Sequence, residues 1–455
     1  MTIPYPYQTE GVHRMEEFGI RALLADEQGL GKTLQSLLVL QRNQERCLPC
    51  IISCPAHLKW NWAREIKVHI GMRAEILEGT RPPTGGFHQQ HKILILNHEI
   101  LKFWAPHLVT LNPGLVVLDE CQAFSSRVSQ RTKAARVLCR TAPHVLALSG
   151  TPITNRTAEL WSILNLIRPD LYPAFWPFAM QFCGPKRNFW GWEFKGATNL
   201  GKLHKGLNEN LMIRRLKADV LQDLPTKRRS IVPLPLADEE EYKEARDDYL
   251  GWIKKRDPTR LGRAEKAEQL GKIGDIRQIV GRLKLPAVCS WVKDFLDGSD
   301  AKLVLYAYHR KVITELEEQF ANQCVRVDGS VTGQKRQHAV DKFLRDKRTR
   351  LFIGQIRAAG TGWNAKGVSD FAFCELDWTP GWHLQAEDRG HGLFRGREGI
   401  RTHSRYLTAG GTFEAGMVKL LVSKQKTLNN VLDDGQGEKF DLLQAVTEAM
   451  EKEIK

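Results

Sequence analysis

Short, almost wholly apolar segments recur along this chain, and stretches of helical or loop character separate them. One set lies in the N-terminal third of the chain, at 22–25, 51–52, 92–96, 115–118 and 144–148. A second set lies closer to the C-terminal end, at 303–307, 325–327, 351–353, 371–373 and 406–407. Strands that are buried on both faces read as continuous apolar runs, and their alternation with helices is typical of parallel sheets covered on both sides. The sequence therefore predicts an α/β fold built as two such blocks.

The alternation fades between the two blocks, from about 153 to 301. This segment carries aromatic residues, then basic clusters, then a charged, helix-prone stretch. A chain of 455 residues is also too long for one ordinary core. We therefore expect four parts, namely an α/β block at 1–170, a helical insertion and linker at 171–295, a second α/β block at 296–430 and a C-terminal part at 431–455 with a helix from Phe440 to Lys455.

The chain is strongly basic, with a net charge of +15 at pH 7. Such a chain is attracted to polyanions, of which nucleic acid is the commonest, although a basic surface without a specific partner is the alternative. The charge runs between the blocks are interpreted in the same two ways, as solvated faces or as DNA contacts; the basic clusters there lie at 214–215 and 227–229. No apolar segment precedes the first charged residues, and none is long enough to cross a bilayer. We expect a cytoplasmic protein that is not secreted.

The nine cysteines are scattered along the chain. Cys47 and Cys50 form one C-x-x-C pair with Cys54 nearby, but no second ligand pair stands at a suitable spacing for structural zinc. Free buried thiols in a reducing cytosol are the expected state of these residues.

The segment from Asp26 to Thr33, with the sequence Asp-Glu-Gln-Gly-Leu-Gly-Lys-Thr, follows the first apolar run and precedes leucines at helical spacing. A glycine-bearing loop between a strand and a helix frees backbone N–H groups that can wrap a phosphate chain. Lys32 can then reach the β- and γ-phosphates, and the Thr33 hydroxyl can bind Mg²⁺. The usual phosphate-loop pattern opens with Gly where this chain has Asp26, so a chance turn is the alternative at this point.

A second chemistry-bearing pair ends the apolar run at 115–118, where Asp119 and Glu120 follow directly. A nucleotide hydrolase needs such a pair, because Asp119 could hold Mg²⁺ while Glu120 orients and deprotonates the attacking water. An ordinary helix cap is the alternative. The presence of Lys32 in the same block favours the catalytic interpretation.

Three further features are each weak evidence for a nucleotide site when taken alone. Gln8 lies upstream of the loop, where its amide could bind an adenine edge. The segment 148–152, Leu-Ser-Gly-Thr-Pro, ends another strand and could pass the state of the carboxylates onward. Arg389, in the second block, could stabilise charge on a transferring phosphate. Each would otherwise be an ordinary surface or turn residue.

Together and in order, these motifs resemble the Swi/Snf-type branch of the superfamily II ATPases, which move along double-stranded DNA. That family itself carries Asp at the position of Asp26, and the phosphate loop departs from it essentially at Gln28, where Met is usual. Further matches lie at Pro55, Leu58, Trp62 and Glu65, and at 327–330, 359–362, 385–391 and 411–414. The resemblance implies two RecA-like parallel-sheet lobes with helical insertions between them, ATP and Mg²⁺ as cofactors, and duplex or forked DNA as partner.

The motifs and the resemblance together assign the site residues. ATP binding is expected at Gln8, Asp26, Gly29, Leu30, Gly31, Lys32, Thr33 and Gly362; Mg²⁺ binding at Thr33 and Asp119; and catalysis at Lys32, Asp119, Glu120, Arg389 and Arg395. Segments 186–192, 199–200, 214–221 and 224–225 are similar to the annealing-helicase (HARP-like) branch, which rewinds DNA and remodels forks. The accessory N-terminal modules of the animal members are absent from this sequence, which suggests a bacterial or phage protein.

Two departures from the family pattern bear on activity. The family usually has His where this chain has Gln122, although an amide can still hydrogen-bond to the segment at 148–152. The family also has an arginine directly after the His of the motif at 385–391, where this chain has Gly392, so Arg395 or Arg397 would have to substitute. Two rival functions stay open. One is another class within the superfamily, a helicase that separates strands on single-stranded DNA or RNA; the other, motivated by Gly392, is a DNA-binding protein with a weakened motor.

Overall fold

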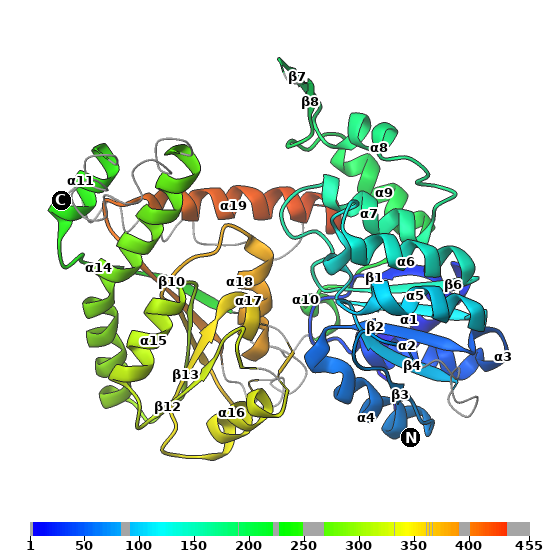
Figure 1. Ribbon diagram of the computed structural model, residues 1–455, viewed down its shortest axis with the longest axis horizontal. Helices are drawn as coiled ribbons and strands as arrows, with labels where there is room; N and C mark the ends of the chain where they lie inside the picture. Colours follow the sequence, from blue (N-terminus) through cyan, green and yellow to red (C-terminus); the bar gives the residue numbers. More distant parts are fainter. Residues whose placement is uncertain are drawn as a thin grey trace. The chain divides into compact units, whose positions relative to one another are not determined.

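A computed structural model (Figure 1) describes residues 3–82, 92–189, 191–221, 227–248, 268–331, 333–360, 362–363, 365, 367–390 and 401–434. The chain forms two compact units. The first comprises 1–224, 379–399 and 423–439, and the second comprises 225–378, 400–422 and 440–455. Among the described residues, none of the helices has the length and apolar character needed to span a membrane.

A seven-stranded parallel sheet forms the centre of the first unit, in the order β3-β4-β2-β5-β6-β1-β9. Its strands are β1 (Arg21–Leu24), β2 (Cys50–Cys54), β3 (Glu75–Ile76), β4 (Ile93–Asn97), β5 (Leu115–Asp119), β6 (His144–Leu148) and β9 (Met212–Ile213). The side chains of β2, β4, β5 and β6 are almost all buried on both faces, which is why these strands read as unbroken apolar runs.

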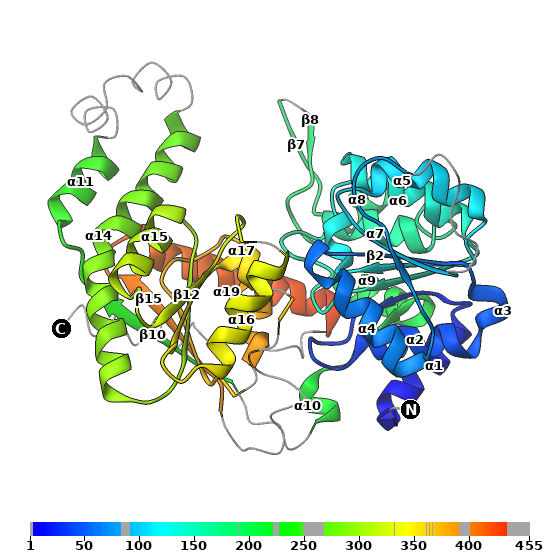
Figure 2. The same ribbon diagram turned by 60° about the horizontal axis from the view of Figure 1, so that its bottom comes forward.

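Helices cover both faces of this sheet (Figures 1 and 2). One face packs against α1 (Pro6–Glu17), α2 (Lys32–Arg42), α3 (Gln44–Cys47) and α4 (Lys59–Ile70). The other face packs against α5 (Leu101–Leu108), α6 (Gln130–Thr141), α7 (Ala158–Ile167), α8 (Phe175–Phe182) and α9 (Leu200–Asn210). A short antiparallel hairpin of β7 (Lys186–Asn188) and β8 (Gly191–Glu193) follows α8.

A six-stranded parallel sheet forms the second unit, in the order β10-β15-β14-β11-β13-β12. The strands are β10 (Arg228–Leu234), β11 (Leu303–Ala307), β12 (Cys324–Val327), β13 (Leu351–Gln355), β14 (Asp370–Phe373) and β15 (His403–Ala409). Its helices are α11 (Glu239–Asp247), α14 (Glu268–Gly298), α15 (Arg310–Gln319), α16 (Gly333–Arg345), α17 (Ile356–Ala359) and the first part of α19 (Phe413–Leu432).

A buried ion pair locks α14 to the start of α19 in this unit. The ammonium of Lys284, which is fully buried, donates to both carboxylate oxygens of Glu414 at 2.7 and 2.8 Å and to the Leu407 carbonyl at 2.7 Å. Moving a charge from water into the protein interior is costly unless the charge is paired and hydrogen-bonded, and both conditions are met here. This contact gives the motif at 411–414 a structural role.

The α/β class, the two parallel sheets and every strand expected from an apolar run are confirmed. The sequence missed β3 and β9, which have two residues each, the hairpin strands β7 and β8, and β10, whose side chains are half-exposed and include Pro233. Strands that are so short or so polar leave no apolar run to find. The four-part division stays a prediction, although the part from 171 to 295 supplies β9 to one sheet and β10 to the other. The helix expected from Phe440 lies outside the described residues.

Candidate active site

The candidate site gathers at one edge of the first sheet. Strands β5, β6 and β1 are neighbours and parallel, so the residues after them meet at the carboxyl edge, where ligands bind in such sheets. The loop from Asp26 to Thr33 follows β1, the Asp119–Glu120 pair ends β5, and Ser149 follows β6. The strand order thus brings together three motifs that are far apart in the sequence.

The loop at 26–33 has the backbone that a phosphate cradle requires. Gly29 and Gly31 have φ angles of 88° and 75°, in the left-handed region that favours glycine. A Cβ on Gly31 would lie 2.4 Å from Nε2 of Gln8, whose amide is buried and donates to the Leu30 carbonyl at 3.1 Å. Gln8 therefore lies against the loop, and Gly31 permits this close approach; the contact of Gln8 with an adenine edge stays a prediction.

Lys32 begins α2, and Thr33 follows it in the first helical turn. The Lys32 ammonium donates to the Asp26 and Glu27 carbonyl oxygens at 2.7 and 3.1 Å. Burial lowers the pKa of Lys32, while the charges of Glu120, Asp26 and Asp119 oppose that shift. A lysine at a helix N-terminus can exchange its two carbonyl acceptors for phosphate oxygens, so the loop fits a nucleoside triphosphate.

Asp119 and Glu120 lie beside Trp62 of α4. The Trp62 indole donates to Asp119 Oδ2 at 2.8 Å, and the Glu120 backbone N–H donates to Asp119 Oδ1 at 3.0 Å. Burial, aided by the Glu120 charge, raises the pKa of Asp119 to about 7, against the effects of Trp62 and Lys32. The two adjacent carboxylates and the hydroxyl of Thr33 in the loop are oxygen donors of the kind that Mg²⁺ prefers, so these residue types fit this ion.

A line of hydrogen bonds runs from Glu120 across the sheet edge. Gln122 Nε2 donates to Glu120 Oε2 at 2.8 Å, and the Ser149 hydroxyl donates to Gln122 Oε1 at 2.7 Å. The Thr151 N–H donates to Ser149 Oγ at 3.0 Å, and Gln385 Nε2 donates to Thr151 Oγ1 at 2.5 Å. Gln122 thus makes the contact to 148–152 that we expected of it in place of His.

Arg389 lies in the 3₁₀ turn after α18 (Pro380–Glu387), in a segment that belongs to the first unit. Its Nε donates to the Gln385 carbonyl at 3.0 Å, and its Nη2 donates to Gln28 Oε1 in the phosphate loop. A Cβ on Gly150 would lie 2.6 Å from Cγ of Gln28, so glycine is needed there. The structure therefore brings Arg389 to the loop.

The other two residues expected in the second block are not brought to the loop by any described contact. Arg395 lies outside the described residues. Gly362 belongs to the second unit and has a φ of 78°. Their assigned roles stay predictions.

The interpretation of the basic cluster at 214–215 as a solvated or DNA-binding run is wrong, because both side chains are largely buried and ion-paired. Arg214 bonds both oxygens of Asp433 and also donates to the Gly150 carbonyl at 2.9 Å. Burial would lower the pKa of Arg214, but Asp433 reverses the effect and the pKa is raised. Arg215 pairs with Asp26 at 2.8 Å.

Asp26 is fully buried, and its carboxylate accepts from Arg215 on both oxygens and from Gln35 Nε2 at 3.0 Å. In the structure described here its side chain therefore fixes the start of the phosphate loop to α2 and to the segment after β9. Sequence reasoning also missed the contacts of Trp62, Arg214 and Asp433. The adjacent arginines after an aromatic-rich segment were the available signal, and they were assigned to the surface.

We expect Arg215→Met to lower the free energy of unfolding by about 3–5 kcal/mol, because it leaves the Asp26 carboxylate buried without its counter-charge. The midpoint of urea-induced unfolding measures this. Arg64→Met, which removes an exposed arginine 3.9 Å from Glu65, is the control and should cost less than about 1 kcal/mol. Equal effects of the two substitutions would contradict the prediction.

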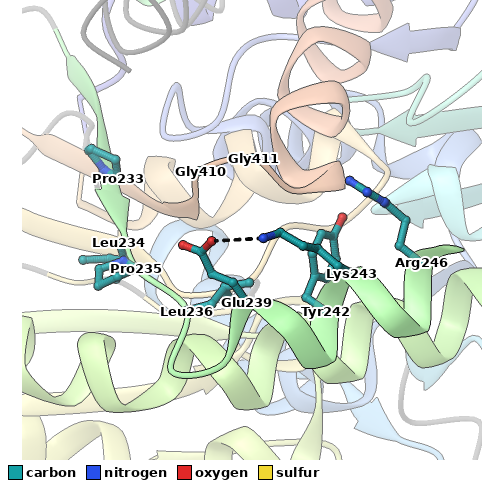
Figure 3. Close-up of a pocket in the computed structure, with 10 residues that line it drawn as sticks. All are labelled: Pro233, Leu234, Pro235, Leu236, Glu239, Tyr242, Lys243, Arg246, Gly410 and Gly411. Carbon is teal, nitrogen blue, oxygen red and sulfur yellow. Dashed lines mark ion pairs between the residues drawn. The ribbon is translucent and has the colours of Figure 1, made fainter. Parts of the chain in front are cut away.

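A cavity of about 370 Å³ lies in the second unit and contains none of the candidate site residues. Figure 3 shows Glu239 and Lys243, one turn apart on α11, pointing toward each other in its lining, together with the segment from Pro233 to Leu236 and the glycines Gly410 and Gly411. The cavity has no assigned part in the site at the first sheet.

Two family models match consecutive parts of the chain. The SNF2-related domain matches residues 7–284, and the helicase conserved C-terminal domain matches residues 285–392. The first match alone covers more than half of the chain and includes the phosphate loop and the Asp119–Glu120 pair. The second includes Arg389.

Curated relatives agree over nearly the whole chain. The chain is 30% identical, over 97% of its length, to a SWI/SNF-related matrix-associated actin-dependent regulator of chromatin subfamily A-like protein 1 homolog of Caenorhabditis elegans, and it covers 62% of that protein. It is also 30% identical, over 98% of its length, to the DNA annealing helicase and endonuclease ZRANB3 of Mus musculus, and it covers 42% of that protein. The chain thus spans between two fifths and two thirds of the length of these relatives.

Among solved structures, the chain is similar to the Sulfolobus solfataricus SWI2/SNF2 ATPase core in complex with dsDNA. The sequence identity is 22%, the TM-score is 0.46, and the match covers 99% of this chain and 97% of that one. With two consecutive family models over 7–392 and with these relatives, the chain belongs to the SNF2-related family, the Swi/Snf-type branch of the superfamily II ATPases.

Proposed function

We propose that this protein is a DNA-dependent ATPase that translocates along duplex DNA and remodels or reanneals it. The observation that carries the proposal is the hydrogen-bonded line from Glu120 through Gln122, Ser149 and Thr151 to Gln385, four residues before Arg389. This line connects a candidate water-activating carboxylate to the segment that carries a candidate arginine finger. Such a link suits an enzyme in which hydrolysis at the carboxylate is coupled to the segment that carries the arginine.

The roles of the loop residues follow from their positions. Lys32 would hold the β- and γ-phosphates, and Gln8 would hold the adenine from beside Leu30. Asp26 would act indirectly, since its carboxylate is occupied by Arg215 and Gln35 and serves to shape the loop. Gly362 and Arg395 are proposed to contribute from segments C-terminal to these.

Thr33 and Asp119 would hold Mg²⁺, which when bound neutralises charge on the phosphates. Glu120 would orient the attacking water and accept its proton, and Gln122 would keep the carboxylate aimed by its hydrogen bond of 2.8 Å. Arg389 would place its guanidinium on the developing negative charge of the γ-phosphate. Its present contact with Gln28 keeps it at the loop before that step.

The DNA part of the proposal rests on charge and on the relatives. A net charge of +15 suits contacts with phosphates that do not depend on sequence. One of the relatives is named as a DNA annealing helicase, which favours rewinding and remodelling of duplexes or forks over strand separation. We also propose the four-part division at 170, 295 and 430, and a bacterial or phage source stays a prediction.

The test is ATP hydrolysis by the purified protein with no nucleic acid, with single-stranded DNA, with blunt duplex and with a forked duplex. We expect strong stimulation by duplex or fork. Stimulation by single strands alone would replace the proposal with the strand-separating helicase. DNA binding without hydrolysis under any of these conditions would show a weakened motor instead.

A further inference from the structure

The hairpin of β7 and β8 is unusually exposed for a folded element. Figures 1 and 2 both show it projecting beyond α8. All three residues of β7 are exposed, and Phe189 at the tip is 93% exposed. A two-stranded hairpin alone is at best marginally stable in water, and a large apolar side chain that is almost wholly exposed can mark a binding surface. The exposure of this ring therefore points to a role beyond the core of the unit.

The base of the hairpin is fixed firmly to the unit. Gly184 and Gly196 face each other so closely that a Cβ on Gly184 would lie 2.9 Å from the Gly196 Cα. The Thr198 hydroxyl donates to the Gln181 carbonyl at 2.9 Å, and its backbone N–H donates to the Phe182 carbonyl at 3.1 Å. The hairpin is therefore anchored to the end of α8 at both of its strands, which limits its movement at the base.

A series of edge-to-face rings continues from the core to the hairpin. The ring centres of Trp161 and Phe175 lie 5.5 Å apart, those of Phe175 and Phe194 lie 5.7 Å apart, and those of Phe194 and Trp176 lie 5.2 Å apart. The ring centres of Trp176 and Trp192 of β8 lie 6.1 Å apart. Trp161 is 7% exposed, whereas Trp176 and Trp192 are 50% and 42% exposed, so the series ends in aromatic surface held in place from behind.

The charges around this aromatic surface are mainly positive. Lys186 and Arg187 of β7 are exposed, and the Arg127 guanidinium lies 4.1 Å from the Phe175 ring centre. The one acidic residue of the two strands, Glu193, is paired with Lys195. Flat aromatic faces beside exposed cations suit a partner that combines π faces with negative charge, which describes unpaired nucleotides. A stacked base pair offers no free face to such rings.

We propose that the β7–β8 hairpin binds unpaired bases next to a duplex, with Phe189 and Trp192 as stacking platforms and Lys186 and Arg187 on the flanking phosphates. This inference rests on the proposed function, because it takes DNA as the partner. It extends that function by assigning recognition of junctions between single-stranded and duplex DNA to a site separate from the ATP site. Trp190 lies outside the described residues and is not needed for the argument.

The test compares Phe189→Ala, and Phe189→Ala with Trp192→Ala, with the unaltered protein. Affinity is measured by fluorescence anisotropy without nucleotide, on blunt duplex and on the same duplex with an unpaired tail. We expect affinity for the tailed DNA to fall on the order of 10-fold, since each stacked base contributes a measurable share of binding. Affinity for blunt duplex and its stimulation of ATP hydrolysis should stay unchanged, and Phe189→Trp should retain tailed-DNA binding.

Trp60→Ala supplies the matched control, because Trp60 is an exposed aromatic residue of the same unit at 70% exposure. It should leave both affinities unchanged. A parallel experiment places 5-iodouracil at the first unpaired position, and photo-crosslinking should attach it to the hairpin peptide and disappear in the double variant. Equal losses on blunt and tailed DNA, or an unchanged tailed affinity, would overturn the hairpin proposal. If duplex fails to stimulate hydrolysis while the tail-specific loss is seen, the translocase proposal fails and the hairpin site stands.

Discussion

Lys32→Ala is expected to reduce ATP hydrolysis by at least about 10²–10³-fold while leaving DNA binding close to that of the unaltered protein. The ammonium is the candidate cationic contact to the β- and γ-phosphates at the start of α2, and its loss removes charge stabilisation where negative charge develops. Hydrolysis measured at saturating duplex, together with duplex affinity by anisotropy, tests both halves of this expectation. The substitution removes one side chain at the loop and no core residue.

Lys67→Ala is the matched control, because Lys67 is an exposed lysine of α4 in the same unit. It should change neither hydrolysis nor the melting temperature appreciably. If Lys32→Ala retained most of the hydrolysis, the phosphate loop would not be the ATP site. If it abolished DNA binding as well, the separation of motor and DNA contact would be wrong.

Arg389→Ala is expected to lower kcat by about 10³-fold or more, with a smaller change in KM, since an arginine finger acts on the transition state. The structure supports this residue because its guanidinium lies at Gln28 of the loop. A second link holds the same turn, in which the Lys217 ammonium donates to Asp388 at 2.6 Å and its backbone N–H donates to Glu27 at 2.6 Å. Single-turnover hydrolysis separates the chemical step from binding.

Arg389→Lys and Arg395→Ala complete this experiment. Lysine keeps the charge but loses the planar fork, so Arg389→Lys should recover only part of the rate. Arg395→Ala measures how far the arginine beyond Gly392 substitutes for the family residue that is absent there. A kcat that fell with Arg395→Ala but not with Arg389→Ala would assign the finger to Arg395.

Much of the fold followed from local pattern. Strands buried on both faces must be apolar throughout, so β2, β4, β5 and β6 are visible as apolar runs in the sequence. Helical segments separate these runs, and that alternation is typical of parallel strands. The phosphate loop and the Asp119–Glu120 pair were likewise predictable, because each is a contiguous motif at a strand end. Strand β9 was not, since two residues carry no periodicity.

What the sequence by itself determined was the α/β class, the two blocks and the residue types that each candidate motif offers, because these depend on neighbours along the chain. The tertiary structure decided how the motifs connect. The pairing of Arg214 with Asp433 joins residues 219 positions apart, and that of Arg215 with Asp26 joins residues 189 apart. The contact of Arg389 with Gln28 spans 361 positions. Charge alone placed Arg214 and Arg215 on the surface; only folding, which removes them from water and requires a partner for each, showed that they hold the candidate site together.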